Sequence, residues 1–212
     1  MFTNTLSSDT FRGIKLLGQS KLVDFAYLAG GTAVALRLGH RQSVDLDFFT
    51  KHQFSEEAIL ADLGKTGEFI KDQVAWQTIM GSFCKVKFSL FFYEYKILSE
   101  ADDFLGVKIA GLEDLAPMKL HAIEDRGSKR DFVDLFWICK EIELVKIFDL
   151  YQQKYGNLED RKYHILRSLN YFEDAESDTV KLQLKKPVDW EEVKEFFVKE
   201  VKQLAKEWGF NG

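Results

Sequence analysis

The stretch from residue 29 to residue 50, AGGTAVALRLGHRQSVDLDFFT, decides the fold that we expect for the whole chain. Asp45 and Asp47 alternate with apolar residues in a predicted strand over 44–49. Side chains two apart on a strand point to the same face, so both carboxylates project side by side while Leu46 points into the core. Neighbouring carboxylates repel each other, and a divalent cation relieves that repulsion. The pattern therefore predicts a metal site.

The beginning of the same stretch predicts a phosphate-binding turn. An apolar strand over 25–29 runs into Gly30 and Gly31, and Thr32 is suited to cap a short helix over 33–38. Free N–H groups and the helix dipole favour phosphate at a helix N-terminus. A phosphate turn beside two metal-binding carboxylates indicates nucleotide chemistry with Mg²⁺ or Mn²⁺.

The composition is that of a globular protein without a membrane segment. The chain has 212 residues, 46% of them hydrophobic and 30% charged, and its formal net charge is −5. A basic nucleic-acid-binding arm is therefore excluded. Cys84 and Cys139 form no CxxC pair, which disfavours a disulfide scaffold and a thiolate zinc site. Because we find no signal peptide and no apolar run near the ~20 residues that span a bilayer, we expect a cytoplasmic protein with no membrane partner.

The periodicity of the chain changes near residue 110. Residues 1–110 alternate helices with short strands, including one long extended segment over 83–95, whereas residues 111–212 are nearly all helical. We therefore predict an α/β (α+β) fold in which a mixed sheet flanked by helices forms the 1–110 core. A mostly helical domain, 111–212, is expected to pack against it. The helices are expected over 8–19, 33–38, 55–63, 112–125, 128–141, 144–155, 160–172 and 190–208.

A second motif, KLHAIEDRGSKRDFVDLFWI at residues 119–138, carries clustered charges. Lys119 and Arg126 lie seven residues apart and share one helix face, while Arg130 and Asp131 open the next helix. Lysine and arginine provide fixed donors for anionic oxygens, so Lys119 and Arg126 are expected to meet a triphosphate. Arg130 and Asp131 are expected to orient the pocket. The alternative is a helical hairpin that carries surface ion pairs.

Together the two motifs resemble the AbiEii/AbiGii-type nucleotidyltransferase toxins, which belong to the superfamily that includes DNA polymerase beta. The resemblance covers roughly residues 25–140 in motif order. It implies the nucleotidyltransferase fold, Mg²⁺ (or Mn²⁺) as cofactor and a nucleoside triphosphate as substrate. It also implies the toxin half of a type IV toxin–antitoxin or phage-defence system, with a cognate antitoxin as partner. Some members of the family transfer nucleotides to tRNA, and RNA, tRNA and protein are the candidate acceptors for this chain.

The resemblance also implies roles for individual residues. Phosphate binding falls on Gly30, Gly31 and Thr32, metal binding on Asp45 and Asp47, and the catalytic lysine and later catalytic aspartate on Lys119 and Asp131.

One position departs from the superfamily pattern. Polymerase-beta-like enzymes place a third carboxylate on a later strand beside the first two, and the matching position in KVKFSLFF is Ser89. Glu94 lies five residues further and on the other face, although Asp131 offers a carboxylate from the helical half. A serine brings no negative charge to a second metal. Three alternatives stay open: one-metal catalysis, a non-catalytic module that binds nucleotide or a partner, and a nucleotidyltransferase that acts on a small molecule.

Overall fold

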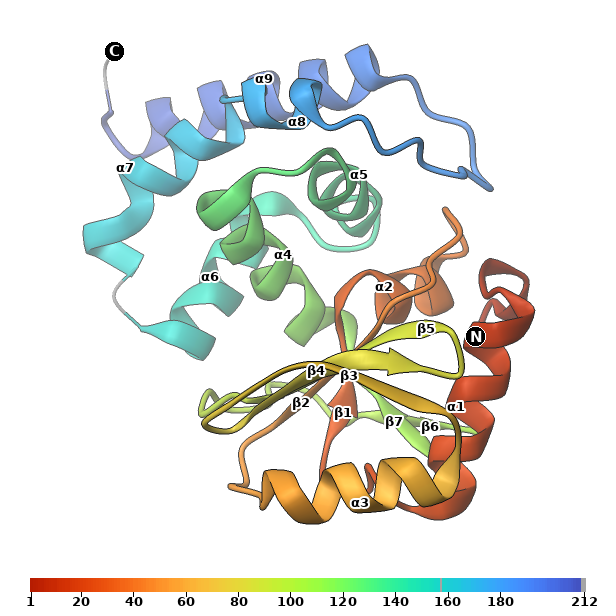
Figure 1. Ribbon diagram of the computed structural model, residues 1–212. Coiled ribbons are helices and arrows are strands. Elements are labelled where there is room, and N and C mark those ends of the chain that lie inside the picture. The colour runs from red at the N-terminus through yellow and green to blue at the C-terminus, as the bar shows by residue number, and fades with distance from the viewer. Residues whose placement is uncertain (157, 211–212) are drawn as a thin grey trace.

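The sheet and most of the helices occupy opposite halves of the computed structural model, which describes residues 1–156 and 158–210 (Figure 1). Seven strands form one sheet in the order β3-β4-β5-β2-β1-β7-β6. The strands are β1 Tyr27–Leu28, β2 Leu46–Thr50, β3 Phe69–Ala75, β4 Thr78–Phe83, β5 Val86–Phe92, β6 Asp102–Phe104 and β7 Val107–Ile109. Because β2 pairs in parallel with β5 and antiparallel with β1, the sheet is mixed. This arrangement confirms the predicted α/β class.

The helices fall into two groups. α1 and α3 cover the sheet, whereas α4 to α9 form the helical half and α2 lies between the two (Figure 1). The helices are α1 Ser8–Ser20, α2 Gly30–Leu38, α3 Glu56–Thr66, α4 Leu112–Arg126, α5 Lys129–Ile138, α6 Leu144–Tyr155, α7 Leu158–Leu169, α8 Glu173–Ser177 and α9 Trp190–Glu207, after a short 3₁₀ turn Thr3–Thr5. None of the described helices is long and apolar enough to cross a membrane.

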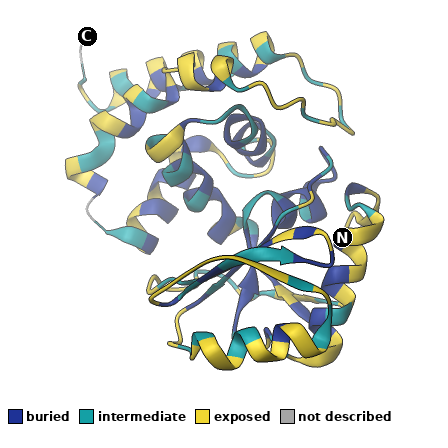
Figure 2. Ribbon diagram, in the orientation of Figure 1, coloured by how far each residue is buried: buried dark blue, intermediate teal, exposed yellow. Residues whose placement is uncertain are grey.

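One cluster of buried apolar residues runs through both halves of the molecule. The central strands, α2, α4 and α5 are largely buried, whereas the outer faces of α1, α3 and α9 are exposed (Figure 2). The helix α2 contacts β2 on one side and α4 and α5 on the other. The predicted boundary at residue 110 falls between β7 and α4, and α2 links the core across that boundary.

The β2 strand has two chemically different faces. Leu46 and Phe48 are fully buried, as the alternation predicts for Leu46, and Phe88 and Leu90 of β5 pair with them and are also fully buried. The residues between them point to the opposite face. In the parallel register Asp47 pairs with Ser89.

The predicted long extended segment over 83–95 contains the strand β5, Val86–Phe92, but its first residues belong to a turn where the chain reverses direction. Phe83 ends β4 and pairs with Val86 at the start of β5. The two residues between them, Cys84 and Lys85, both take the left-handed conformation with φ of 51° and 68°. Two left-handed residues are what a tight two-residue hairpin turn requires. The apolar alternation continues on both sides of this turn, and therefore conceals it.

Candidate active site

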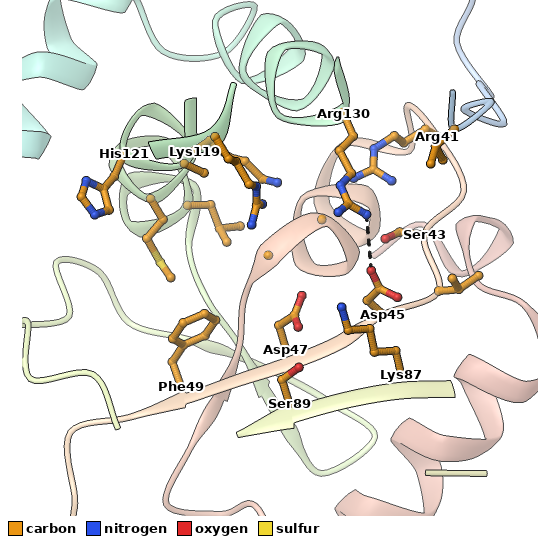
Figure 3. A pocket seen from close by; sticks show the side chains of 18 of the residues that line it. Arg41, Ser43, Asp45, Asp47, Phe49, Lys87, Ser89, Lys119, His121 and Arg130 are labelled. Carbon is orange, nitrogen blue, oxygen red and sulfur yellow. Dashed lines mark ion pairs between the residues drawn. The ribbon is translucent and has the colours of Figure 1, made fainter. Parts of the chain in front are cut away.

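A pocket of about 550 Å³ lies between the sheet and the helices α4 and α5 (Figure 3). Residues of β2, β5 and α4 line it, together with the turn that begins α2. The charged residues that line it are Arg41, Asp45, Asp47, Lys87, Lys119, Asp125, Arg126, Arg130 and Lys181. Cations outnumber carboxylates in this lining, so the pocket suits a polyanion.

Asp45 and Asp47 both face this pocket (Figure 3). Burial raises the pKa of Asp47, and the charge of Asp45 raises it further. Two neighbouring carboxylates in a partly desolvated pocket gain from a bound cation. Carboxylate oxygens are the donors that Mg²⁺ and Mn²⁺ prefer, so Asp45 and Asp47 would be the residues that hold a divalent cation in this pocket.

The residue of β5 that pairs with Asp47 is not a carboxylate. The described part of the chain contains no group of three or more His, Cys, Asp or Glu side chains placed to hold a metal. The position across from Asp47 on β5 is Ser89, and Ser89 is buried. Ser89 therefore supplies no carboxylate to a second ion at this position.

The two glycines allow close contacts with charged side chains. Gly30 has φ +64°, and a Cβ atom there would lie 2.8 Å from Asp47 Oδ2. At Gly31 a Cβ atom would lie 2.3 Å from Arg41 Nη2. A Cβ atom at either position would force the neighbouring side chain to shift, and the positive φ of Gly30 itself favours glycine. These glycines also open α2, where N–H groups have no acceptor within the helix.

The prediction that Thr32 caps the helix is wrong. The helix α2 already begins at Gly30, with Ala29 as its N-cap residue and no side-chain cap. Thr32 is buried and does not line the pocket. Its hydroxyl donates to the carbonyl of Asp45 and lies 2.9 Å from Ser43 Oγ. Thr32 therefore fixes the backbone that carries the first aspartate.

Asp131 lies in a buried ion-pair network rather than on the pocket surface. Lys119 Nζ lies 2.9 Å from its Oδ1, Arg126 Nε lies 2.8 Å from its Oδ2, and the Ser128 hydroxyl donates to it at 2.6 Å. Burial alone would raise the pKa of Asp131, but Lys119 and Arg126 outweigh burial and hold it well below its usual range. Lys119 and Arg126 do line the pocket, as does Arg130, so Asp131 supports two of the three predicted cations from behind.

Asp134 is the centre of a second buried network. It accepts from Arg41 Nε at 2.6 Å and Nη2 at 2.9 Å, from His40 Nε2 at 2.8 Å, and lies 2.7 Å from Lys119 Nζ. Burial opposes its charge, yet Arg41 and Lys119 hold the pKa of Asp134 well below its usual value. Burial lowers the pKa of His40, whose neutral ring donates to Asp134. The network ties the turn before β2 to α4 and α5.

Sequence patterns did not reveal Arg41 as a lining residue. Arg41 is buried, with its guanidinium against Gly31 and its Nη1 atom donating to the Gln42 carbonyl. Its partner Asp134 lies 93 positions away. Arg130 was predicted, and its Nη1 atom lies 3.7 Å from Asp45 Oδ2 (Figure 3).

Comparisons with known proteins found a matching family model and a relative of similar length. A family model described as the nucleotidyl transferase AbiEii toxin of a type IV toxin–antitoxin system matches residues 15–89. Over 183 residues the chain is 39% identical to an uncharacterized protein of Aquifex aeolicus (strain VF5). This match covers 84% of this chain and 86% of that protein.

Two solved structures share the fold over nearly the whole chain. The crystal structure of JHP933 from Helicobacter pylori is 20% identical with a TM-score of 0.56, and the match covers 95% of this chain and 94% of that one. MenT4, a nucleotidyltransferase toxin from Mycobacterium tuberculosis H37Rv, is 16% identical with a TM-score of 0.54, covering 94% and 86%. At these identities the likeness shows the fold alone.

Proposed function

The chain belongs to the AbiEii family of nucleotidyltransferase toxins, and from this premise we propose that it transfers a nucleoside monophosphate from a nucleoside triphosphate to an acceptor hydroxyl. The observation that carries the proposal is the position of Asp45 and Asp47 beside the Gly30–Gly31 turn in one cation-rich pocket. Carboxylates beside a phosphate-binding helix N-terminus suit metal-assisted phosphoryl chemistry.

Asp45 and Asp47 would hold the metal. When bound, Mg²⁺ supplies charge neutralisation for the α-phosphate and the departing pyrophosphate. The side chains of the protein then have to hold the triphosphate in line with the acceptor. Free N–H groups of the Gly30–Gly31 turn bind the β- and γ-phosphates at the positive end of α2.

Lys119 and Arg126 neutralise the remaining triphosphate charge from the α4 wall. Their ion pairs with Asp131 hold both cations in one orientation, which lowers the cost of ordering them around substrate. A carboxylate that already binds two cations, with a pKa held well below its usual range, is a poor proton acceptor. We therefore assign Asp131 a positioning role in place of the catalytic role that the family resemblance implies.

The direct test is transfer of label from each of the four α-labelled nucleoside triphosphates in the presence of Mg²⁺. Acceptors should include purified tRNA, total RNA, protein extract and a set of small hydroxyl compounds, because each acceptor class remains a candidate. Asp45→Asn and Asp47→Asn should each lower the transfer rate at least 100-fold, which corresponds to a loss of about 3 kcal/mol of transition-state stabilisation. Asp72→Asn, on the exposed strand β3, is the matched control and should retain full activity.

A second candidate function is binding of nucleotide without transfer. It is favoured by Ser89, which pairs with Asp47 where the superfamily has its third carboxylate. Titration calorimetry separates the two functions: nucleotide binding that depends on Asp47, with no pyrophosphate released on any acceptor, would favour the binding module. As a member of a toxin family, the chain is also expected to bind a cognate antitoxin, which co-purification with the product of the neighbouring reading frame would reveal.

A further inference from the structure

The floor of the pocket changes from charged to aromatic over two residues of β2. Asp47 and Phe49 lie two residues apart on β2, and their partners on β5 are Ser89 and Phe91. Alternate residues share a strand face and lie roughly 6.6 Å apart along the strand. The metal-binding carboxylate is therefore followed directly by a pair of phenyl rings whose centroids lie 5.5 Å apart.

Side chains from both halves of the molecule complete this aromatic end. The Tyr93 ring lies 5.2 Å from the Phe49 ring, and the Tyr93 hydroxyl is hydrogen-bonded to that of Tyr155 at 2.5 Å. Tyr155 ends α6, and its ring lies 5.1 Å from His121 of α4. In Figure 3, Phe49 and His121 lie on the opposite side of Asp47 from Arg41 and Arg130.

These rings differ from the aromatic residues of the core. Phe48 and Phe88, on the other face of the same strands, are fully buried. Phe49, Phe91, Tyr93 and Tyr155 are only partly buried and line the pocket. Part of their surface is therefore available to a ligand.

We propose that the aromatic end binds the base of the nucleoside triphosphate whose phosphates lie at the charged end. The inference rests on the proposed function and deepens it, because it fixes the direction of the nucleotide along β2 and makes Phe49 and Tyr155 substrate-binding residues. A nucleotide has a polyanionic end and a flat aromatic end, joined by a ribose. With the α-phosphate at Asp45 and Asp47, the base reaches the rings that begin at Phe49, two residues further along β2. Base–aromatic stacking is favourable and accepts any base.

The test compares two ligands that share phosphates but differ in the base. Calorimetry with Mg²⁺ measures the affinity of a non-hydrolysable α,β-methylene nucleoside triphosphate and that of inorganic tripolyphosphate. Phe49→Leu and Tyr155→Leu keep an apolar side chain but remove the ring. Each substitution should lower the affinity for the nucleotide analogue about fivefold or more and change the affinity for tripolyphosphate less than twofold. Arg130→Gln should lower the affinity for both ligands. Trp76 is an exposed residue outside the pocket, so Trp76→Leu should change neither affinity.

Three results would overturn the inference while leaving the proposed function intact. In the first, the two ring variants bind the analogue as tightly as wild type. In the second, their affinities for both ligands fall by the same factor, which would mean that the rings only support the fold. In the third, analogue binding is unchanged but the KM for the acceptor rises, which would assign the rings to the acceptor. If wild type binds neither ligand, the proposed function fails as well.

Discussion

Asp134→Asn is expected to be among the most destabilising single substitutions in this protein. Asn has nearly the same shape as Asp but no charge, so the change leaves the buried Arg41 without its counter-ion and Lys119 with Asp131 alone. Removing one partner of a buried ion pair costs about 3–5 kcal/mol. Since native proteins have only about 5–15 kcal/mol of stability, this loss would be a large fraction of the total.

The assay is urea unfolding followed by tryptophan fluorescence, with a thermal melt beside it. The free energy of unfolding should fall by about 3 kcal/mol or more, and Tm by roughly 10 °C for a chain of this size. Asp149→Asn is the matched control, because Asp149 is exposed and lies 3.8 Å from Lys146, and it should change stability by less than about 0.5 kcal/mol. A loss at Asp134 no larger than the loss at Asp149 would refute the idea that this carboxylate organises the buried network.

Gly31→Ala should lower transfer activity, because its Cβ atom would lie 2.3 Å from the guanidinium packed there. Gly64→Ala in α3, where a Cβ meets nothing within 4 Å, should keep activity and add about 0.5–1 kcal/mol of stability; equal activities would contradict the packing role. Acid should destabilise the protein in two stages. Because the pKa of His40 is lowered, the unfolded state binds that proton first, and stability falls as pH drops below about 6.5. The contribution of Asp134, whose pKa is depressed, is complete above about pH 5 and falls as pH drops through the ordinary carboxyl range. Urea titrations between pH 3 and 8 measure both stages, and a flat profile would contradict them.

Local patterns predicted the parts of this structure that depend on neighbouring residues. Alternation on β2 was enough to send Leu46 into the core, because a strand has a period of two. The helix over 144–155 was predicted at its exact bounds, since its apolar residues recur on one face and Gly156 follows. Thr32 shows the limit of such reasoning. Its hydroxyl suits a helix cap, but in the fold it donates to the carbonyl of Asp45, 13 residues later, where the chain passes back beside α2.

Two features had no local signal at all. The β4–β5 turn uses Cys84 and Lys85 in left-handed conformations where Asn or Gly is usual, so the sequence carries no turn marker there. The contact between Arg41 and Asp134 joins residues 93 positions apart, and each charge taken alone resembles a surface group. Long-range ion pairs of this kind become visible only when the sheet and the helical half are brought together around α2.

The most direct measurement is transfer of α-labelled nucleotide to an RNA or other acceptor by wild type and by folded Asp47→Asn in the same Mg²⁺ buffer. Wild type is expected to label one acceptor class, and Asp47→Asn to lose at least 100-fold of that rate while keeping its melting temperature within a few degrees. A folded Asp47→Asn protein that labels the same acceptor at the wild-type rate would contradict the assignment of this pocket as the active site.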